Sequence, residues 1–180
     1  SYLSTYIERD IRIIRNIHNL KQFHRYLVLL AARSAQLFNL NEISKECGIS
    51  QTTAKDWLNI LEATAIVCLL EQYSRNITKR VIKSPKLFFV DTGLLCYLLR
   101  IENAEQLIHF PFGGHIFENM VVMEKIKEFA EKGERASCYF YKAKGGEEVD
   151  LIIDYGDKFE AYEIKFSSML NSRMTQSLLK

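Results

Sequence analysis

The sequence predicts an α+β protein in which a helical domain, residues 1–100, precedes a mixed domain, residues 101–180. Apolar residues recur at helical spacing through most of the first 64 residues, with a glycine-containing turn between two short helices. The last third instead contains one apolar helix and three short runs rich in branched and aromatic residues, which are typical of strands. At 180 residues the chain can hold one large or two small cores.

Composition limits the class of protein more than its activity. The chain is 48% hydrophobic and 26% charged, as in ordinary globular proteins, and its net charge of +2 neither predicts nor excludes a nucleic-acid partner. Four cysteines are scattered singly, which favours a reducing cytoplasm over a disulfide framework or a zinc site. No apolar run approaches the length of a membrane span and no signal peptide opens the chain, so we expect a cytoplasmic location and no membrane partner.

The first domain begins with two predicted helices, residues 2–18 and the more apolar residues 21–36, the second of which we expect at its centre. The chain starts at Ser1 already within a helical pattern and ends soon after the last predicted strand. We therefore expect a fragment of a longer protein.

A helix-turn-helix pattern follows. Asn41–Cys47 forms the first helix, Gly48 and Ile49 the turn, and Ser50 the N-cap of a helix over Gln51–Thr64. The spacing of four apolar positions predicts one buried face on the second helix: Ala54, Trp57, Leu58 and Leu61. Strands at Ile66–Gln72 and Lys86–Val90 then flank a polar loop, Ser74–Ser84, and the whole pattern predicts a winged helix.

Two groups of residues are candidates for nucleic-acid contact. The wing, from Gln72 through Val90, has no acid but carries the cations Arg75, Lys79, Arg80, Lys83 and Lys86, which would give a salt-dependent grip on DNA phosphates. The exposed face of the second helix carries Gln51, Thr52, Lys55, Asp56 and Asn59. Asp56 counts against DNA contact there, and winged helices also serve as protein-interaction and hinge modules, so both alternatives stay open.

The second domain opens after a capped helix over Asp91–Arg100 and an irregular segment that runs to Gly114. We predict a helix at residues 115–130 that packs on a sheet. Glu118 in its first turns has two interpretations. It is either an acid favourably placed near a helix N-terminus, or a carboxylate directed at the strands that follow.

The last strands form a predicted β-hairpin, Val149–Asp154 and Phe159–Lys165, with a two-residue loop at Gly156-Asp157. In that register Asp150 faces Glu163, and Lys165 lies on the same side. Opposed like charges are destabilising, and a divalent cation would offset their repulsion. The alternative is a surface ion pair, because the same register places Lys165 opposite Glu148.

Asp150, a short hairpin and then Glu163-Ile164-Lys165 resemble the D…ExK core of the PD-(D/E)XK nuclease fold, with Val149 where the namesake motif has proline. With a strand at Tyr139–Lys142, the order helix, strand, strand, strand also matches that restriction-endonuclease-like core. The fold usually continues with a helix and a strand, so this domain is expected to be incomplete. The resemblance implies that Asp150 and Glu163, assisted by Glu118, bind Mg²⁺ or Mn²⁺. It also implies that Lys165 orients or activates the attacking water and stabilises the charge of the reacting phosphate.

Nearly the whole chain resembles the C-terminal region of prokaryotic AAA-type ATPases, long catalogued as of unknown function. The resemblance is carried by YIERDI, LLAARSAQLFN, YSRNITKRVIKSPKLFFVDTGLLCYLL, FEN and YFYK…GGEEVDLII…EIK. It implies an N-terminal P-loop ATPase domain as a partner in the same protein, and leaves room for a homo-oligomer. No G-x-x-x-x-G-K-[ST] motif occurs here, so this chain has no ATP site of that kind.

Three functions remain open from the sequence. The first is a nucleic-acid-binding, metal-dependent DNA nuclease that hydrolyses phosphodiesters. The second is a catalytically silent regulatory or protein-interaction module of the ATPase. The third is a transcription regulator that reads DNA with residues 51–59.

Overall fold

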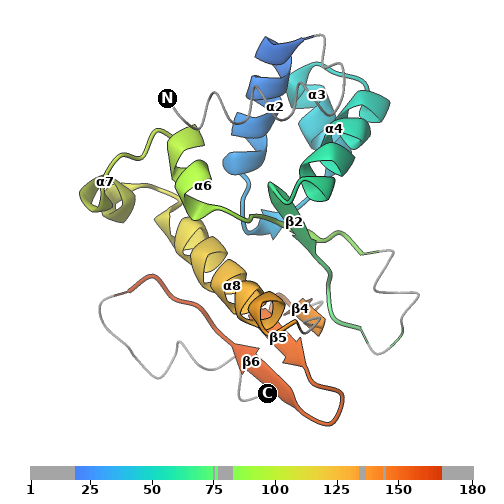
Figure 1. Ribbon diagram of the computed structural model, residues 1–180, viewed down its shortest axis with the longest axis vertical. Helices are drawn as coiled ribbons and strands as arrows, with labels where there is room; N and C mark the ends of the chain where they lie inside the picture. Colours follow the sequence, from blue (N-terminus) through green and yellow to red (C-terminus); the bar gives the residue numbers. More distant parts are fainter. Residues whose placement is uncertain (1–18, 75, 77–82, 134–136, 144, 168–180) are drawn as a thin grey trace.

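The computed structural model describes residues 19–74, 76, 83–133, 137–143 and 145–167, which form six helices and two antiparallel three-stranded sheets (Figure 1). Four helices gather at one end of the molecule: α2 (Leu20–Ala31), α3 (Leu40–Cys47), α4 (Gln51–Ala63) and α6 (Thr92–Leu98). The other end holds β4 (Ser137–Lys142), β5 (Glu148–Asp154) and β6 (Phe159–Tyr162), and α8 (Gly113–Glu131) runs between the two ends. The mixed helix and strand content agrees with the prediction. The predicted helix at residues 2–18 lies outside the described residues.

The helix, turn and helix predicted over residues 41–64 are present as α3, Gly48-Ile49 and α4. Gly48 ends α3 in the left-handed conformation, with φ 72° and ψ 37°, which glycine adopts without a steric penalty. The Ser50 side chain then accepts a hydrogen bond from the Thr53 backbone N–H and caps α4. The four apolar positions predicted to face inward on α4 are all buried.

The predicted helix 21–36 is too long, since α2 ends at Ala31. Ala35 has a φ of 59°, which a right-handed helix cannot contain, and its backbone N–H donates to the Leu87 carbonyl at 2.7 Å. The next two residues form β1 (Gln36–Leu37). Pairing with a strand from farther along the chain therefore overrides the local helical preference.

The first sheet has the order β1-β3-β2, so that β3 (Lys86–Phe89) lies between β1 and β2 (Val67–Leu70). The second has the order β4-β5-β6. Its hairpin has the predicted register, with Ile152 opposite Ala161 and Asp154 opposite Phe159. The loop is also as predicted, because the Tyr155 N–H donates to the Lys158 carbonyl across Gly156-Asp157.

The two sheets are joined edge to edge by the residues that follow β2. The Tyr73 N–H donates to the Phe140 carbonyl at 2.7 Å, and the Phe140 N–H donates to the Glu71 carbonyl at 3.1 Å. The Gln72 side chain adds a bond to the Lys142 carbonyl at 2.6 Å. Backbone hydrogen bonds, as well as side-chain packing, thus connect the first sheet to the second.

Two apolar clusters fill the interior. The first belongs to the helical end and contains Trp57 and Phe89. The second lies under α8 and combines Phe88 of β3 with Val122 of α8 and Leu151 of β5. The predicted domain division at residue 100 stays a prediction, but this second cluster takes side chains from both sides of it.

The segment after α6 is more ordered than predicted, because Ala104–His109 forms a short helix, α7. Gly113, which lies in the segment predicted to be irregular, is the buried first residue of α8. A Cβ at this position would lie 2.6 Å from the Leu107 carbonyl oxygen, so the close approach of the two helices requires glycine. Within the described residues, no helix combines the length and the apolar character needed to cross a bilayer.

Candidate functional site

Asn119 fixes α8 against the end of β3. Its side chain is fully buried and makes paired bonds to Phe89, accepting from the backbone N–H at 2.7 Å and donating to the carbonyl at 2.9 Å. The Ser34 hydroxyl donates to the same amide oxygen at 2.7 Å. The Asn119 amide thus pairs the backbone N–H and carbonyl of Phe89 as a neighbouring strand would. The two-residue strand β1 is too short to reach Phe89.

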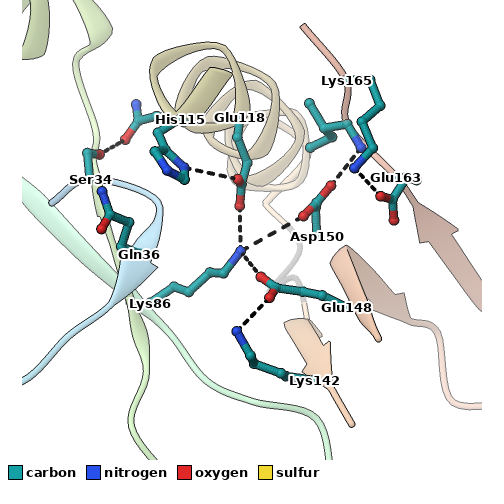
Figure 2. Close-up of polar contacts among 12 residues, drawn as sticks. Ser34, Gln36, Lys86, His115, Glu118, Lys142, Glu148, Asp150, Glu163 and Lys165 are labelled. Atoms are coloured by element: carbon teal, nitrogen blue, oxygen red, sulfur yellow. Dashed lines mark hydrogen bonds and ion pairs between the residues drawn. The ribbon is translucent and has the colours of Figure 1, made fainter. Parts of the chain in front are cut away.

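One residue earlier, Glu118 faces a cluster of charges around Lys86 (Figure 2). Lys86 opens β3, and its side chain is buried against Glu118 of α8 and Glu148 of β5, so that only 3% of the residue is exposed. Its Nζ lies 2.7 Å from Glu118 Oε1, 2.6 Å from Glu148 Oε1 and 3.9 Å from Asp150 Oδ1. The prediction that Lys86 belongs to an exposed basic wing is therefore wrong. Its position in the strand turns it inward onto three carboxylates.

Asp150 is positioned by the hairpin. It is 8% exposed, and its Oδ2 accepts a hydrogen bond from the Ile164 backbone N–H at 2.7 Å. The ladder between β5 and β6 ends at Leu151 and Tyr162, so the strand predicted to reach residue 165 stops three residues earlier. Beyond that point the Asp150 side chain, rather than a strand backbone, holds the chain.

Glu163 and Lys165 form an ion pair with each other beside Asp150 (Figure 2). The alternative pairing of Lys165 with Glu148 is wrong. Glu148 instead bridges Lys86 and Lys142, whose Nζ lies 2.9 Å from Glu148 Oε2. Lys165 is left at the edge of the site with 42% of its side chain exposed, and the Glu163 side chain is only 10% exposed.

All four residues predicted as catalytic line one cavity of about 910 Å³ between the helical end and the second sheet. They are Glu118 of α8, Asp150 of β5, and Glu163 and Lys165 beyond β6. Among the residues that the structure describes, the cavity wall contains five acids: Glu42, Glu118, Glu148, Asp150 and Glu163. Its cations are Arg33, Lys86, Lys142 and Lys165. Buried carboxylates therefore lie deep in the site, and the partly exposed cations Lys142 and Lys165 lie nearer to solvent.

The pKa values of the buried charged groups are shifted in different directions. Burial, with Glu118 nearby, raises the pKa of Asp150 from its ordinary value of 3.8 to about 6. Burial alone would lower the pKa of Lys86, but Glu118 and Glu148 outweigh it and the pKa is raised. Burial opposes ionisation of Glu148 too, yet hydrogen bonds from Lys86 and Lys142 lower its pKa. Lys86 is thus held as an ammonium among acids that repel one another.

The donor chemistry suits Mg²⁺ or Mn²⁺, which use one or two protein carboxylates and complete their shell with water and substrate phosphate. Asp150 and Glu163 are neighbours in the cavity, and Glu118 approaches from α8. However, no three His, Cys, Asp or Glu side chains among the described residues are arranged to hold a metal ion together. The Lys86 ammonium lies among Glu118, Glu148 and Asp150, where it supplies the positive charge.

Comparison with known proteins places the chain in a family. Residues 1–105, more than half of the sequence, match the family model described as Domain of unknown function (DUF8612). The chain belongs to this family. Residues 113–180 match a second model, Domain of unknown function (DUF4143), which is often found at the C-terminus of AAA-type ATPases. At this coarse level the match confirms the resemblance to the C-terminal region of such ATPases.

Two curated relatives extend the likeness over almost the whole chain. They are the uncharacterized proteins Mb2031c of Mycobacterium bovis and Rv2008c of Mycobacterium tuberculosis, each 29% identical over 167 residues. The alignment covers 93% of this chain but 37% of each relative, so the chain spans little more than a third of their length. No solved structure matches the chain.

The residues predicted to contact nucleic acid are only partly within the described structure. Thr52 and Lys55 are exposed on α4, and Gln51 is exposed while its side chain donates to Asn41 Oδ1 at 2.7 Å. Lys83 is also exposed. Three further candidates lie outside the described residues: Arg75, Lys79 and Arg80. The exposed positions on α4 are compatible with the prediction and leave it untested.

Lys86 and Glu148 were not predicted as members of the site, and His115 is a further neighbour of it. The His115 Nδ1 lies 3.9 Å from Glu118 Oε2 at the mouth of the cavity. One signal was available for Lys86, because a lysine opens the otherwise apolar strand KLFF. A charge at the start of a strand buried along its whole length needs a buried partner.

Proposed function

We propose that this chain is the C-terminal region of an AAA-type ATPase and that its cavity is a metal-dependent nuclease site. The observation that carries the proposal is that Glu118, Asp150, Glu163 and Lys165 line one cavity. One helix and one hairpin bring them there, as a PD-(D/E)XK core would. The assignment of the helical end as a winged helix, and of α8 with β4–β6 as a nuclease-like core, belongs to the same proposal.

In this proposal Asp150 and Glu163, with Glu118, would hold Mg²⁺ or Mn²⁺. The cation would supply an activated water and neutralise charge on the reacting phosphate. Lys165 contributes a fixed positive charge. Burial lowers its pKa, but the hydrogen bond and charge of Glu163 outweigh that effect and raise it, so the amine stays protonated. We therefore assign Lys165 to binding and stabilising a phosphate oxygen rather than to accepting a proton from water.

The helical end would deliver the nucleic acid. The exposed polar residues of α4 and the cation Lys83 are available to phosphate oxygens. Lys142 and Lys165 at the cavity edge would continue this positive path toward the acids. DNA is the expected partner, and its binding should weaken with added salt because it depends on phosphate contacts.

A second candidate is a catalytically silent module that regulates or docks the ATPase. The position of Lys86 favours it, because the ammonium already balances the carboxylates that a metal would need. In this case the charge cluster would serve to hold β3, α8 and β5 together.

Hydrolysis of labelled single- and double-stranded DNA in Mg²⁺ or Mn²⁺ separates the two candidates. We expect metal-dependent cleavage that falls roughly a hundredfold or more in Asp150→Asn, because a bound metal contributes several kcal/mol to the transition state. Asp157→Asn is the matched control, since Asp157 is exposed in the turn of the same hairpin. Absence of metal-dependent cleavage, or equal loss in both variants, would reject the nuclease and favour the silent module.

A further inference from the structure

We infer that Lys86 is a built-in competitor of the divalent cation, so that a metal binds tightly only when the Lys86 ammonium leaves the carboxylates. This inference rests on the proposed function, because it concerns the cation of that same site. It assigns a role to a residue outside the hairpin motif, contributed by a different part of the chain.

The geometry places Lys86 where a cation is needed. Its Nζ contacts carboxylate oxygens from both walls of the cavity, at 2.7 Å on Glu118 of α8 and 2.6 Å on Glu148 of β5. It is also 3.9 Å from Asp150. Only 4% of the Lys86 side chain is exposed, so water screens these charges little.

A metal ion that binds among these acids would be repelled by the Lys86 ammonium. A divalent ion on Asp150 and Glu118 would lie close to the ammonium in a poorly screened cavity, and like charges repel strongly there. Glu118, one of the acids that would bind the metal, is already in contact with Lys86 at 2.7 Å, and Asp150 lies 3.9 Å from the same ammonium. Either the Lys86 ammonium or a divalent metal ion can neutralise these carboxylates, but the two cannot do so together.

Lysine is suited to such an exchange. Its backbone is fixed in the middle strand of the first sheet, and its four-carbon stem lets the ammonium swing while the strand stays in place. The cavity offers space for this movement, because Lys86 itself lines the wall. Movement of β3 relative to α8 and β5 would likewise change metal affinity, which links the helical end of the molecule to the site.

Calorimetric titration of the chain with Mn²⁺ tests the inference without measuring activity. Lys86→Met removes the competing charge. The double variant Lys86→Met/Glu148→Gln also removes one acid, so that a neutral pair replaces an ion pair and folding is favoured. We expect the double variant to bind Mn²⁺ about tenfold or more tightly than the wild type, because the repulsion is gone.

Two controls define the site. Lys142→Met also removes a partner of Glu148, but its side chain is 40% exposed at the edge, so Mn²⁺ affinity should stay within about twofold of the wild type. Adding Asp150→Asn to the double variant should abolish the gain. Circular dichroism and thermal melts establish that each variant is folded.

Equal Mn²⁺ affinity in the wild type and the folded double variant would overturn the inference, as would micromolar binding by the wild type itself. The result is separable from the nuclease proposal. Tighter Mn²⁺ binding without DNA cleavage would support the role of Lys86 and reject the nuclease. Metal-dependent cleavage with unchanged Mn²⁺ affinity in the Lys86 variants would support the nuclease and reject the role of Lys86.

Discussion

Two consecutive residues join α8 to β3 in different ways. Asn119 makes neutral hydrogen bonds to the Phe89 backbone and is fully buried, whereas Glu118 makes a charged contact with Lys86 in the wall of a cavity. The structure fully explains the presence of Asn119, because its amide pairs backbone groups that would otherwise be buried without partners. The charged contact has no such explanation.

Charge is an inefficient way to hold two elements together in a protein interior. Removing two ions from water costs several kcal/mol, and apolar residues of similar size often stabilise as well or better. A fold that needed only cohesion at this point could use a second amide or an apolar pair. The excess of acids around Lys86, and their position on a cavity, therefore support the proposed binding role of the cluster over a purely cohesive one.

The largest effect is expected for Lys86→Met. Loss of the ammonium leaves Glu118 and Glu148 facing each other without a cation, which should lower the free energy of unfolding by about 3–5 kcal/mol near pH 7.5. Urea denaturation measures this loss. It should diminish toward pH 5, where Asp150, whose pKa is raised to about 6, is largely protonated and repels the other two acids less, and Glu148→Gln should restore part of it. A loss below about 1 kcal/mol would show that the cluster contributes little to folding.

Asn119→Ala should cost somewhat less, about 2–4 kcal/mol, because it leaves the N–H and carbonyl of Phe89 without partners in the interior. Neutral hydrogen bonds do not titrate, so the loss should be the same from pH 5 to pH 8. Asn59→Ala, exposed on α4, is the matched control and should change stability by no more than about 0.5 kcal/mol. A pH-dependent loss in Asn119→Ala would erase the distinction between the two contacts.

The same contrast explains what the sequence could predict. The hairpin register as far as Leu151 and Tyr162 followed from a two-residue turn, since local geometry decides which side chains share a face. The convergence of Asp150 with Glu163 and Lys165 was also predicted, but beyond the ladder the bond from the Ile164 N–H to Asp150 holds the chain there. Lys86 could not be placed in this way, because its partners Glu118 and Glu148 are far along the chain. It stood instead in a stretch without acids, where five cations resembled a basic wing.

The end of α2 was unpredictable for a related reason. Ala35 has no intrinsic preference for positive φ, so nothing local announced the break at Ala31. The bond from Ala35 to the Leu87 carbonyl, formed only in the folded chain, decides it. Both the end of α2 and the position of Lys86 therefore depend on contacts of β3 that could not be predicted from the sequence.

The smallest effect, and the one most diagnostic of the site, is expected for Asp150→Asn. A carboxyl whose pKa rises from 3.8 to about 6 on folding binds protons more tightly in the native state than in the unfolded state. Its contribution to stability is therefore favourable below pH 4 and is lost as the pH rises toward 6. At 1.36 kcal/mol per pKa unit, the total is about 3 kcal/mol.

Asparagine avoids this loss, and its side-chain oxygen can still accept the bond from the Ile164 N–H. We expect Asp150→Asn to be about 2–3 kcal/mol more stable than the wild type at pH 8 and nearly equal to it at pH 4, measured by urea denaturation across that range. Asp157→Asn, in the exposed turn, should follow the wild-type curve. Parallel curves for Asp150→Asn and the wild type would mean that Asp150 is ionised at no cost, and that the buried acids are balanced without need of a second cation.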